Sequence, residues 1–83
     1  MRKKQELPDW FDGEVYEEGS IVTNPYSGEY FELNNLELSM YDFVKGSEFI
    51  LNSVPSDSLA DLFYKGLDWF KENNIKAYIT LLD

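Results

Sequence analysis

Acidic side chains are the most frequent chemistry-bearing groups in this sequence, and many of them gather within residues 9–32. No basic residue occurs between Lys4 and Lys45. Carboxylate oxygens are the ligands that hard cations prefer, so the cluster is a candidate metal site. Its spacing does not match a calcium-binding loop, which needs acids at fixed positions, a central Gly and a terminal Glu. We therefore interpret it as a solvated acidic face without a metal. Its members are Asp9, Asp12, Glu14, Glu17, Glu18, Glu29 and Glu32.

Catalytic chemistry has little support in the residue types present. The chain has no Cys and no His, which removes thiolate ligands and the commonest general base. Two carboxylates acting as acid and base need a cleft between them, and 83 residues leave little room for one. The five Gly form no phosphate-binding loop, and Ser27-Gly28 lacks the flanking Gly of a nucleophile elbow. We expect no enzyme activity, no catalytic residue and no cofactor.

Aromatic residues make up 17% of the chain and are the second conspicuous class. Tyr26, Tyr30 and Phe31 could form a base-stacking platform, but the surrounding acids argue against it because such platforms lie in basic grooves. Trp10 and Phe11 are expected to anchor their segment onto the core. A partner-binding hot spot is the alternative, because Trp is enriched at such sites.

Two further aromatics lie beside the apolar stripe of a predicted helix and are expected to be partly exposed. They are Tyr64 and Trp69. The candidate interaction residues are therefore Trp10, Phe11, Tyr64 and Trp69, and burial of Tyr64 or Trp69 in a homo-oligomer is a further possibility.

Length and charge bound the class of protein. Eighty-three residues suffice for one domain, which we expect over residues 7–83 after a flexible arm at residues 1–6. The net charge is -9, although three of the seven basic residues lie in the arm. The negative charge of residues 7–83 repels nucleic acid and anionic membranes and favours a basic protein partner. Because no apolar run is long enough for a membrane span or a signal peptide, we expect a soluble, cytoplasmic protein.

The local pattern predicts a β-hairpin followed by a helix. Residues 20–23 are β-branched, residues 24–28 carry Pro and Gly where a turn needs them, and residues 29–33 return as a second strand. Asn34 is the predicted N-cap of a helix through residue 51, and Glu37 completes a capping box. Gly46 lies inside this helix, which indicates close approach of another element or, failing that, a kink.

A second helix follows the break at Pro55. Ser56 or Ser58 is its predicted cap, and apolar residues at helical spacing continue to Phe70. The pair Asn73-Asn74 is expected to end it in a left-handed conformation. Residues 75–82 suit either a helix face or a strand, and we favour a short helix.

The predicted fold is therefore α+β, a small and mostly helical single domain. An N-terminal β-hairpin packs on an αα-hairpin, and a short C-terminal helix follows. The expected core consists of Leu36, Met40, Phe43, Val44, Ile50, Leu59, Leu62, Phe63, Leu67, Phe70, Tyr78 and Leu82.

Several short segments of the sequence resemble those of an uncharacterised family of small acidic proteins from marine bacteriophages and ocean metagenomes. The similar segments are Asn24-Pro25-Tyr26-Ser27-Gly28-Glu29, Glu32-Leu33, Glu37-Leu38, Tyr41-Asp42-Phe43-Val44-Lys45-Gly46, Lys65-Gly66-Leu67-Asp68-Trp69-Phe70, Ala77-Tyr78 and Leu81-Leu82-Asp83. The resemblance spans roughly residues 8–83, although Ile75 stands where members often have Pro. The resemblance implies a phage accessory protein in the host cytoplasm and assigns no site residue.

Two functions follow as hypotheses. The first is a non-enzymatic interaction module that binds a protein, either a basic partner or a second copy of itself. The alternative is an acidic mimic of nucleic acid that occupies a basic groove on a DNA-binding protein. The mimic requires the acids to lie along one face of the molecule.

Overall fold

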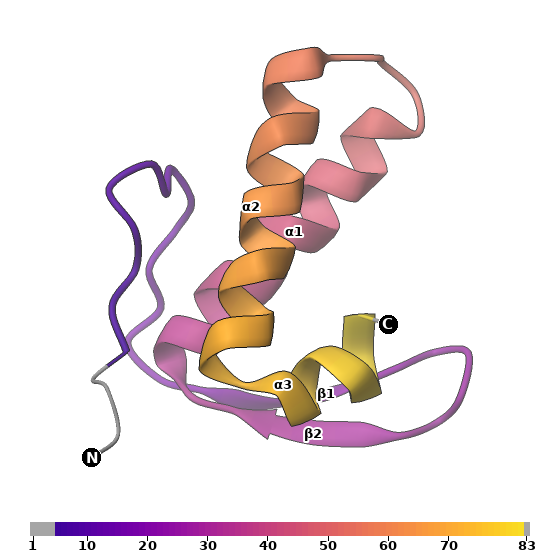
Figure 1. The fold of residues 1–83 in the computed structure, drawn as a ribbon. Coiled ribbons are helices and arrows are strands. Elements are labelled where there is room, and N and C mark those ends of the chain that lie inside the picture. The colour runs from indigo at the N-terminus through magenta and orange to yellow at the C-terminus, as the bar shows by residue number, and fades with distance from the viewer. Residues whose placement is uncertain (1–4, 83) are drawn as a thin grey trace.

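Two short strands and two long helices follow one another along the chain, and a short helical segment comes last. The computed structural model describes residues 5–82, so residues 1–4 of the predicted arm lie outside the described residues. The elements are β1 (Ser20–Thr23), β2 (Tyr30–Leu33), α1 (Asn35–Leu51), α2 (Asp57–Asn73), α3 (Ile75–Ala77) and the π-helical turn η1 (Tyr78–Leu82). Figure 1 shows the two long helices side by side, with the β-hairpin across one end of the pair. This confirms the predicted α+β fold.

The β-hairpin forms because its turn satisfies the chain locally. The Asn24 side chain accepts hydrogen bonds from the backbone N–H groups of Tyr26 and Ser27, at 2.9 and 3.4 Å. Gly28 then takes a φ of 78°, a left-handed conformation that costs Gly little. The strands pair antiparallel, with Ser20 opposite Leu33 and Thr23 opposite Tyr30.

The predicted capping box of α1 is present. The Asn34 side chain accepts from the Glu37 N–H at 2.8 Å, and the Glu37 carboxylate accepts from the Asn34 N–H at 2.9 Å. Two of the free N–H groups at the start of the helix are thereby satisfied, which holds the chain at the angle where it leaves β2.

The close approach between the two long helices occurs at Gly66 and not at Gly46, so the expectation for Gly46 was wrong. A Cβ on Gly66 would lie 2.6 Å from Cγ2 of Val44, whereas one on Gly46 would meet nothing within 4 Å. Gly66 is buried in the contact with α1, and Gly46 is exposed on the opposite side of its helix. A side chain at residue 66 would therefore push the helices apart.

Replacing Gly46 by Ala is expected to stabilise the protein by up to about 1 kcal/mol. Ala has the higher helix propensity, and the site has open space for the added methyl group. Urea denaturation followed by circular dichroism measures the change. Gly66→Ala is the matched control and should lower stability; equal effects of the two substitutions would contradict the packing described here.

Asn74 turns the chain from α2 into the C-terminal helix. It ends α2 with a φ of −158° and a ψ of 82°, which is extended and not the left-handed cap expected from the sequence. Its side chain accepts from the Ala77 N–H at 3.1 Å and so also caps α3. The extended conformation is favoured because it frees this side chain to start the next helix. The helical prediction for residues 75–82 is confirmed.

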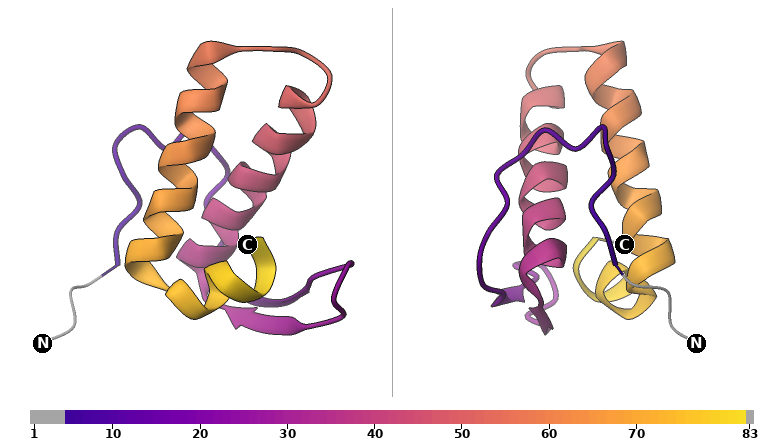
Figure 2. Two further views of the ribbon diagram at one scale, coloured as in Figure 1. Left: turned by 45° about the vertical axis from the view of Figure 1, so that its right-hand side comes forward. Right: turned by 90° about the vertical axis from the view of Figure 1, so that its left-hand side faces the viewer.

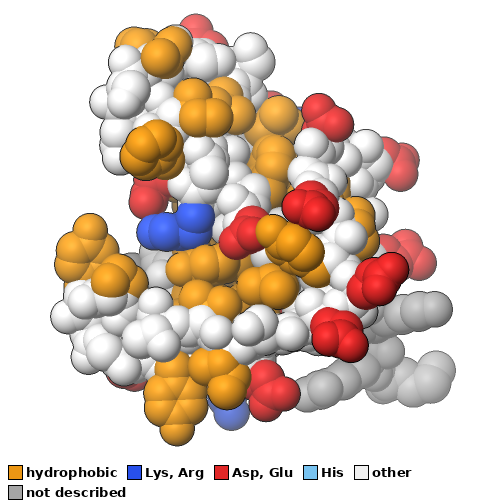
Figure 3. Space-filling view, turned by 180° about the vertical axis from the view of Figure 1, so that it is seen from behind, with side chains coloured by type: hydrophobic (Ala, Val, Ile, Leu, Met, Phe, Trp, Pro, Cys, Tyr) orange, Lys and Arg blue, Asp and Glu red, His pale blue; other side chains and the backbone are white. Residues whose placement is uncertain are grey.

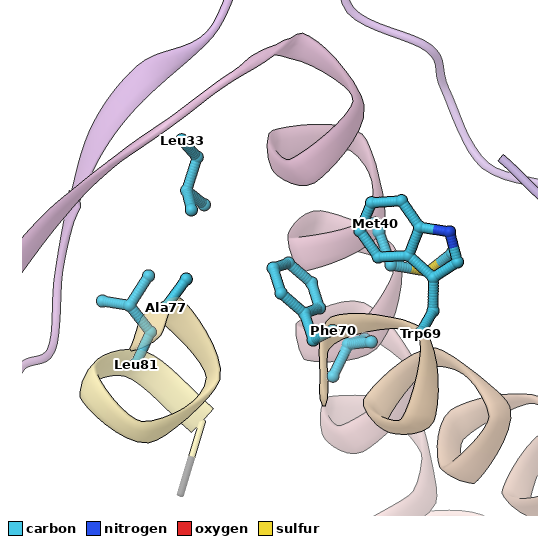
Figure 4. Close-up of a cluster of buried hydrophobic side chains, with 7 residues drawn as sticks. Leu33, Met40, Trp69, Phe70, Ala77 and Leu81 are labelled. Carbon is cyan, nitrogen blue, oxygen red and sulfur yellow. The ribbon is translucent and has the colours of Figure 1, made fainter. Parts of the chain in front are cut away.

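The core forms where β2, α1, α2 and the C-terminal helix meet (Figure 4). Of the predicted core, three residues are fully buried and most others are half-buried around them. Ile50 is a correction, since it is 49% exposed. The buried hydrophobic residues are Leu33, Met40, Val44, Trp69, Phe70, Ala77 and Leu81.

The segment before β1 covers one side of the helix pair without forming a helix or strand (Figure 2). Phe11 donates its N–H to the Pro8 carbonyl at 3.0 Å, and the Tyr16 N–H donates to Oγ of Ser39 at 2.9 Å. Within the predicted arm, the backbone carbonyl of Glu6 accepts from the Trp69 indole N–H at 2.9 Å. Contacts of side chains therefore hold this segment against α1 and α2.

Candidate interaction surface

The buried carboxylate of Glu37 is the first group to consider for chemistry, because it is 5% exposed. One of its oxygens accepts from the Asn34 N–H. The other accepts from the side-chain amides of Gln5 and Asn74, each at 2.9 Å. We call these four residues the Glu37 hub. Both oxygens are occupied by neutral donors of the same chain, so the hub joins three segments and leaves no oxygen free for a substrate.

The other buried polar side chains are also committed to the fold. Ser39 donates to the Asn35 carbonyl at 2.7 Å while accepting from Tyr16, and Ser47 donates to the Phe43 carbonyl at 2.7 Å. No buried side-chain polar atom of residues 5–82 lacks a hydrogen-bond partner. Within the same residues, no three acidic, His or Cys side chains come together as a metal site. The unsatisfied groups that often mark a catalytic site are thus missing from this part of the chain.

One tyrosine has an altered acidity for a structural reason. The hydroxyl of Tyr16 donates to the carboxylate of Asp42, and this hydrogen bond raises the pKa of Tyr16 above its ordinary value of 10.0. The neutral phenol is the form that the fold stabilises. Its contribution to stability is therefore present below pH 10 and is lost as the pH rises through the raised pKa.

The four residues singled out in the sequence occupy three different environments. Trp10 and Phe11 are half-buried against Phe43, with ring centroids 6.0 and 5.4 Å apart, which agrees with the anchoring interpretation. Tyr64 is 63% exposed. Trp69 is a correction, because it is only 7% exposed and packs edge-on against Phe70. The segment over Trp69 buries it, so Trp69 offers no surface for a homo-oligomer contact.

An exposed apolar patch at the end of the helix pair was not singled out from the sequence. Phe49 is 76% exposed, and Ile50 and Val54 lie beyond it in α1 and the following loop. We call these three residues the helix-tip patch; Figure 3 shows hydrophobic side chains gathered at this end of the molecule. The only sequence signal was that Phe49 falls at the margin of the apolar stripe of α1. Periodicity places it there but does not show that the neighbouring elements leave it 76% exposed.

A second unpartnered surface lies on the outer side of the β-hairpin. Residues opposite one another in a sheet share a face, so Ile21, Glu32, Thr23 and Tyr30 project together. All four are exposed, whereas Val22 and Phe31 on the other face pack against the core. We call the four exposed residues the hairpin face.

Charge is distributed unevenly between the two halves of the chain. Lys45, Lys65 and Lys71 each pair with an acid of their own helix, at 3.1, 3.2 and 4.0 Å. Residues 5–34 contain eight acidic side chains and no basic one, and none of the eight forms an ion pair with another described residue. Figure 3 shows most acidic side chains of that view on one side of the molecule. We call the eight acids of residues 5–34 the unpaired acids. They are Glu6, Asp9, Asp12, Glu14, Glu17, Glu18, Glu29 and Glu32.

Comparison with known proteins adds no relative to this picture. No family model, curated protein or solved structure matches the chain. Within residues 5–82, none of the helices combines the length and the apolar character that crossing a membrane requires.

Proposed function

We propose that this protein is a non-enzymatic protein-interaction module, an accessory factor of the kind that its resemblance to small phage proteins implies. The observation that carries the proposal is the exposed apolar surface. The three residues of the helix-tip patch, Phe49, Ile50 and Val54, are 76%, 49% and 58% exposed in a domain of only 83 residues. Contiguous apolar patches on a small domain commonly mark sites of protein interaction. The committed hydrogen bonds of Glu37, Ser39 and Ser47 support a scaffold without catalytic groups.

A tagged pull-down from a bacterial lysate, read by mass spectrometry at low and high salt, tests this proposal. We expect one specific protein to be retained. Phe49→Lys should reduce its recovery if the helix-tip patch contributes, while Glu72→Gln, an exposed site on α2, should not. Loss of the partner at high salt would indicate a basic partner held by charge. Retention of no specific protein at either salt concentration would overturn the proposal.

A second candidate function is the acidic mimic of nucleic acid, and the distribution of the unpaired acids favours it. Twelve acidic residues of 5–82 form no ion pair with another described residue, and eight of the twelve lie within residues 5–34. Such a surface can occupy a groove that normally binds phosphates. Competition distinguishes the two functions: duplex DNA should displace the retained partner from a mimic and leave the partner of an apolar surface bound.

A further inference from the structure

The free edge of strand β1 presents backbone groups that the sheet does not use. Hydrogen-bonded and non-hydrogen-bonded pairs alternate along an antiparallel ladder. The Asn24 N–H donates to the Glu29 carbonyl at 2.7 Å, so the pair Val22 and Phe31, two residues on, is also of the bonded kind. Ile21 and Thr23 therefore direct their N–H and C=O groups away from β2.

The two residues that carry these outward groups are exposed. Ile21 is 62% exposed and Thr23 is also exposed. Within residues 5–82, these groups take part in a long hydrogen bond, in which the Ser20 hydroxyl donates to the Ile21 carbonyl at 3.5 Å. Helices α1 and η1 pack on β2, and Figure 2 shows β1 as the strand farther from the C-terminal helix. In the right-hand view of Figure 2, no helix or strand of the described residues lies on the outer side of β1.

The surroundings of the edge select the chemistry of its occupant. A shallow depression of about 360 Å³ adjoins Ile21 and is also lined by Glu17 and Glu32. Neither carboxylate forms an ion pair with another described residue. A long cationic side chain fits such a place, with its aliphatic stem on Ile21 and its charge between the carboxylates.

A second copy of this chain is a poor occupant for the same reason. Pairing two β1 edges would bring the carboxylates of both copies together, and charged residues on an exposed edge commonly prevent such self-association. A segment rich in Lys or Arg would be attracted by the carboxylates of Glu17 and Glu32.

We propose that the edge of β1 accepts an extended, basic segment of a partner protein as a third strand of the sheet. Backbone hydrogen bonds to Ile21 and Thr23 hold the segment, and its alternate side chains lie on the hairpin face. This inference rests on the proposed function and names the surface and partner chemistry for it.

The test uses a capped synthetic peptide of alternating Lys and Val residues with the full chain, followed by NMR titration and amide hydrogen exchange. We expect saturable binding that slows exchange of the Ile21 and Thr23 amides by at least about tenfold. Ile21→Lys should weaken binding by at least about tenfold, because it removes apolar contact and adds repulsion. Phe49→Lys changes the net charge equally at another exposed site and should alter affinity by less than about twofold.

Several outcomes would overturn the proposal. They are the absence of saturable binding, protection of amides outside β1, and equal weakening by Ile21→Lys and Phe49→Lys. Both substitutions are at exposed positions, and their NMR spectra report directly that the fold is retained. A lysate protein retained by Ile21→Lys but lost by Phe49→Lys would also overturn the edge proposal, while leaving the proposed function intact.

Discussion

Replacing Glu37 by Ala is expected to lower the free energy of unfolding by about 3 kcal/mol, because three donors lose their acceptor and two of them belong to half-buried residues. These donors are the N–H of Asn34 and the side-chain amides of Gln5 and Asn74. A chain of this length has a total unfolding free energy of about 4–12 kcal/mol. The substitution should therefore remove roughly a quarter to three quarters of that free energy. Urea denaturation followed by Trp fluorescence measures the loss.

Two further variants separate the hydrogen bonds from other effects of the Glu37 substitution. Glu37→Gln keeps the shape but turns an NH₂ group toward donors, so it should still cost about 1–3 kcal/mol. Glu72→Ala removes an exposed carboxylate from α2 and should change stability by less than about 0.5 kcal/mol. If Glu37→Ala were as mild as Glu72→Ala, the hub would not be holding the three segments together.

The second large effect is expected at Gly19, where Ala should cost about 3 kcal/mol. An added Cβ would lie 2.0 Å from the Leu33 carbonyl oxygen and 2.8 Å from Cα of Asn34. Both atoms belong to the backbone at the point where β2 leads into α1. They cannot rotate aside as a side chain would, so the strands must separate or the cap of α1 must shift. Thermal denaturation measures the change in stability.

Amide chemical shifts show where the Gly19→Ala structure gives way. The changes should centre on β1, β2 and the capping box, leaving the far end of the helix pair unchanged. Gly46→Ala serves as the control because it is the same substitution in open space, with the opposite expected sign. Shift changes spread evenly over both helices would contradict the local clash.

The elements of this fold could be predicted because their signals are local. Asn34 and Glu37 are three residues apart, and the side chain of Asn24 closes its turn within three residues. Such contacts can be read directly from the sequence. The capping box, the hairpin and both long helices were accordingly predicted at the correct places.

The parts that were wrong depend on elements far apart in the chain. Trp69 is buried, and its indole N–H donates to the backbone carbonyl of Glu6, 63 residues earlier. Gly46 and Gly66 both lie inside long helices, yet only Gly66 faces the other helix. Periodicity gives the apolar side of each helix but not the point at which the helices cross. Ile50 was placed in the core for the same reason.

The candidate surfaces were predicted only in part. The excess of acids and the exposure of Tyr64 follow from the sequence, whereas the free edge of β1 depends on which strand α1 and η1 cover. The helix-tip patch likewise depends on the conformation of the loop between α1 and α2. A pattern of residue types contains neither piece of information.

The segment before β1 has a consequence for local unfolding. Residues 5–19 have no hydrogen-bonded ladder, and side-chain contacts such as those of Trp10 and Tyr16 hold them in place. Segments of this kind detach at lower free energy than helices that share a core. Limited proteolysis should therefore nick the protein first near Gly13, while α1 and α2 remain intact. Each detachment would briefly expose more of the half-buried aromatic ring of Phe43 to water.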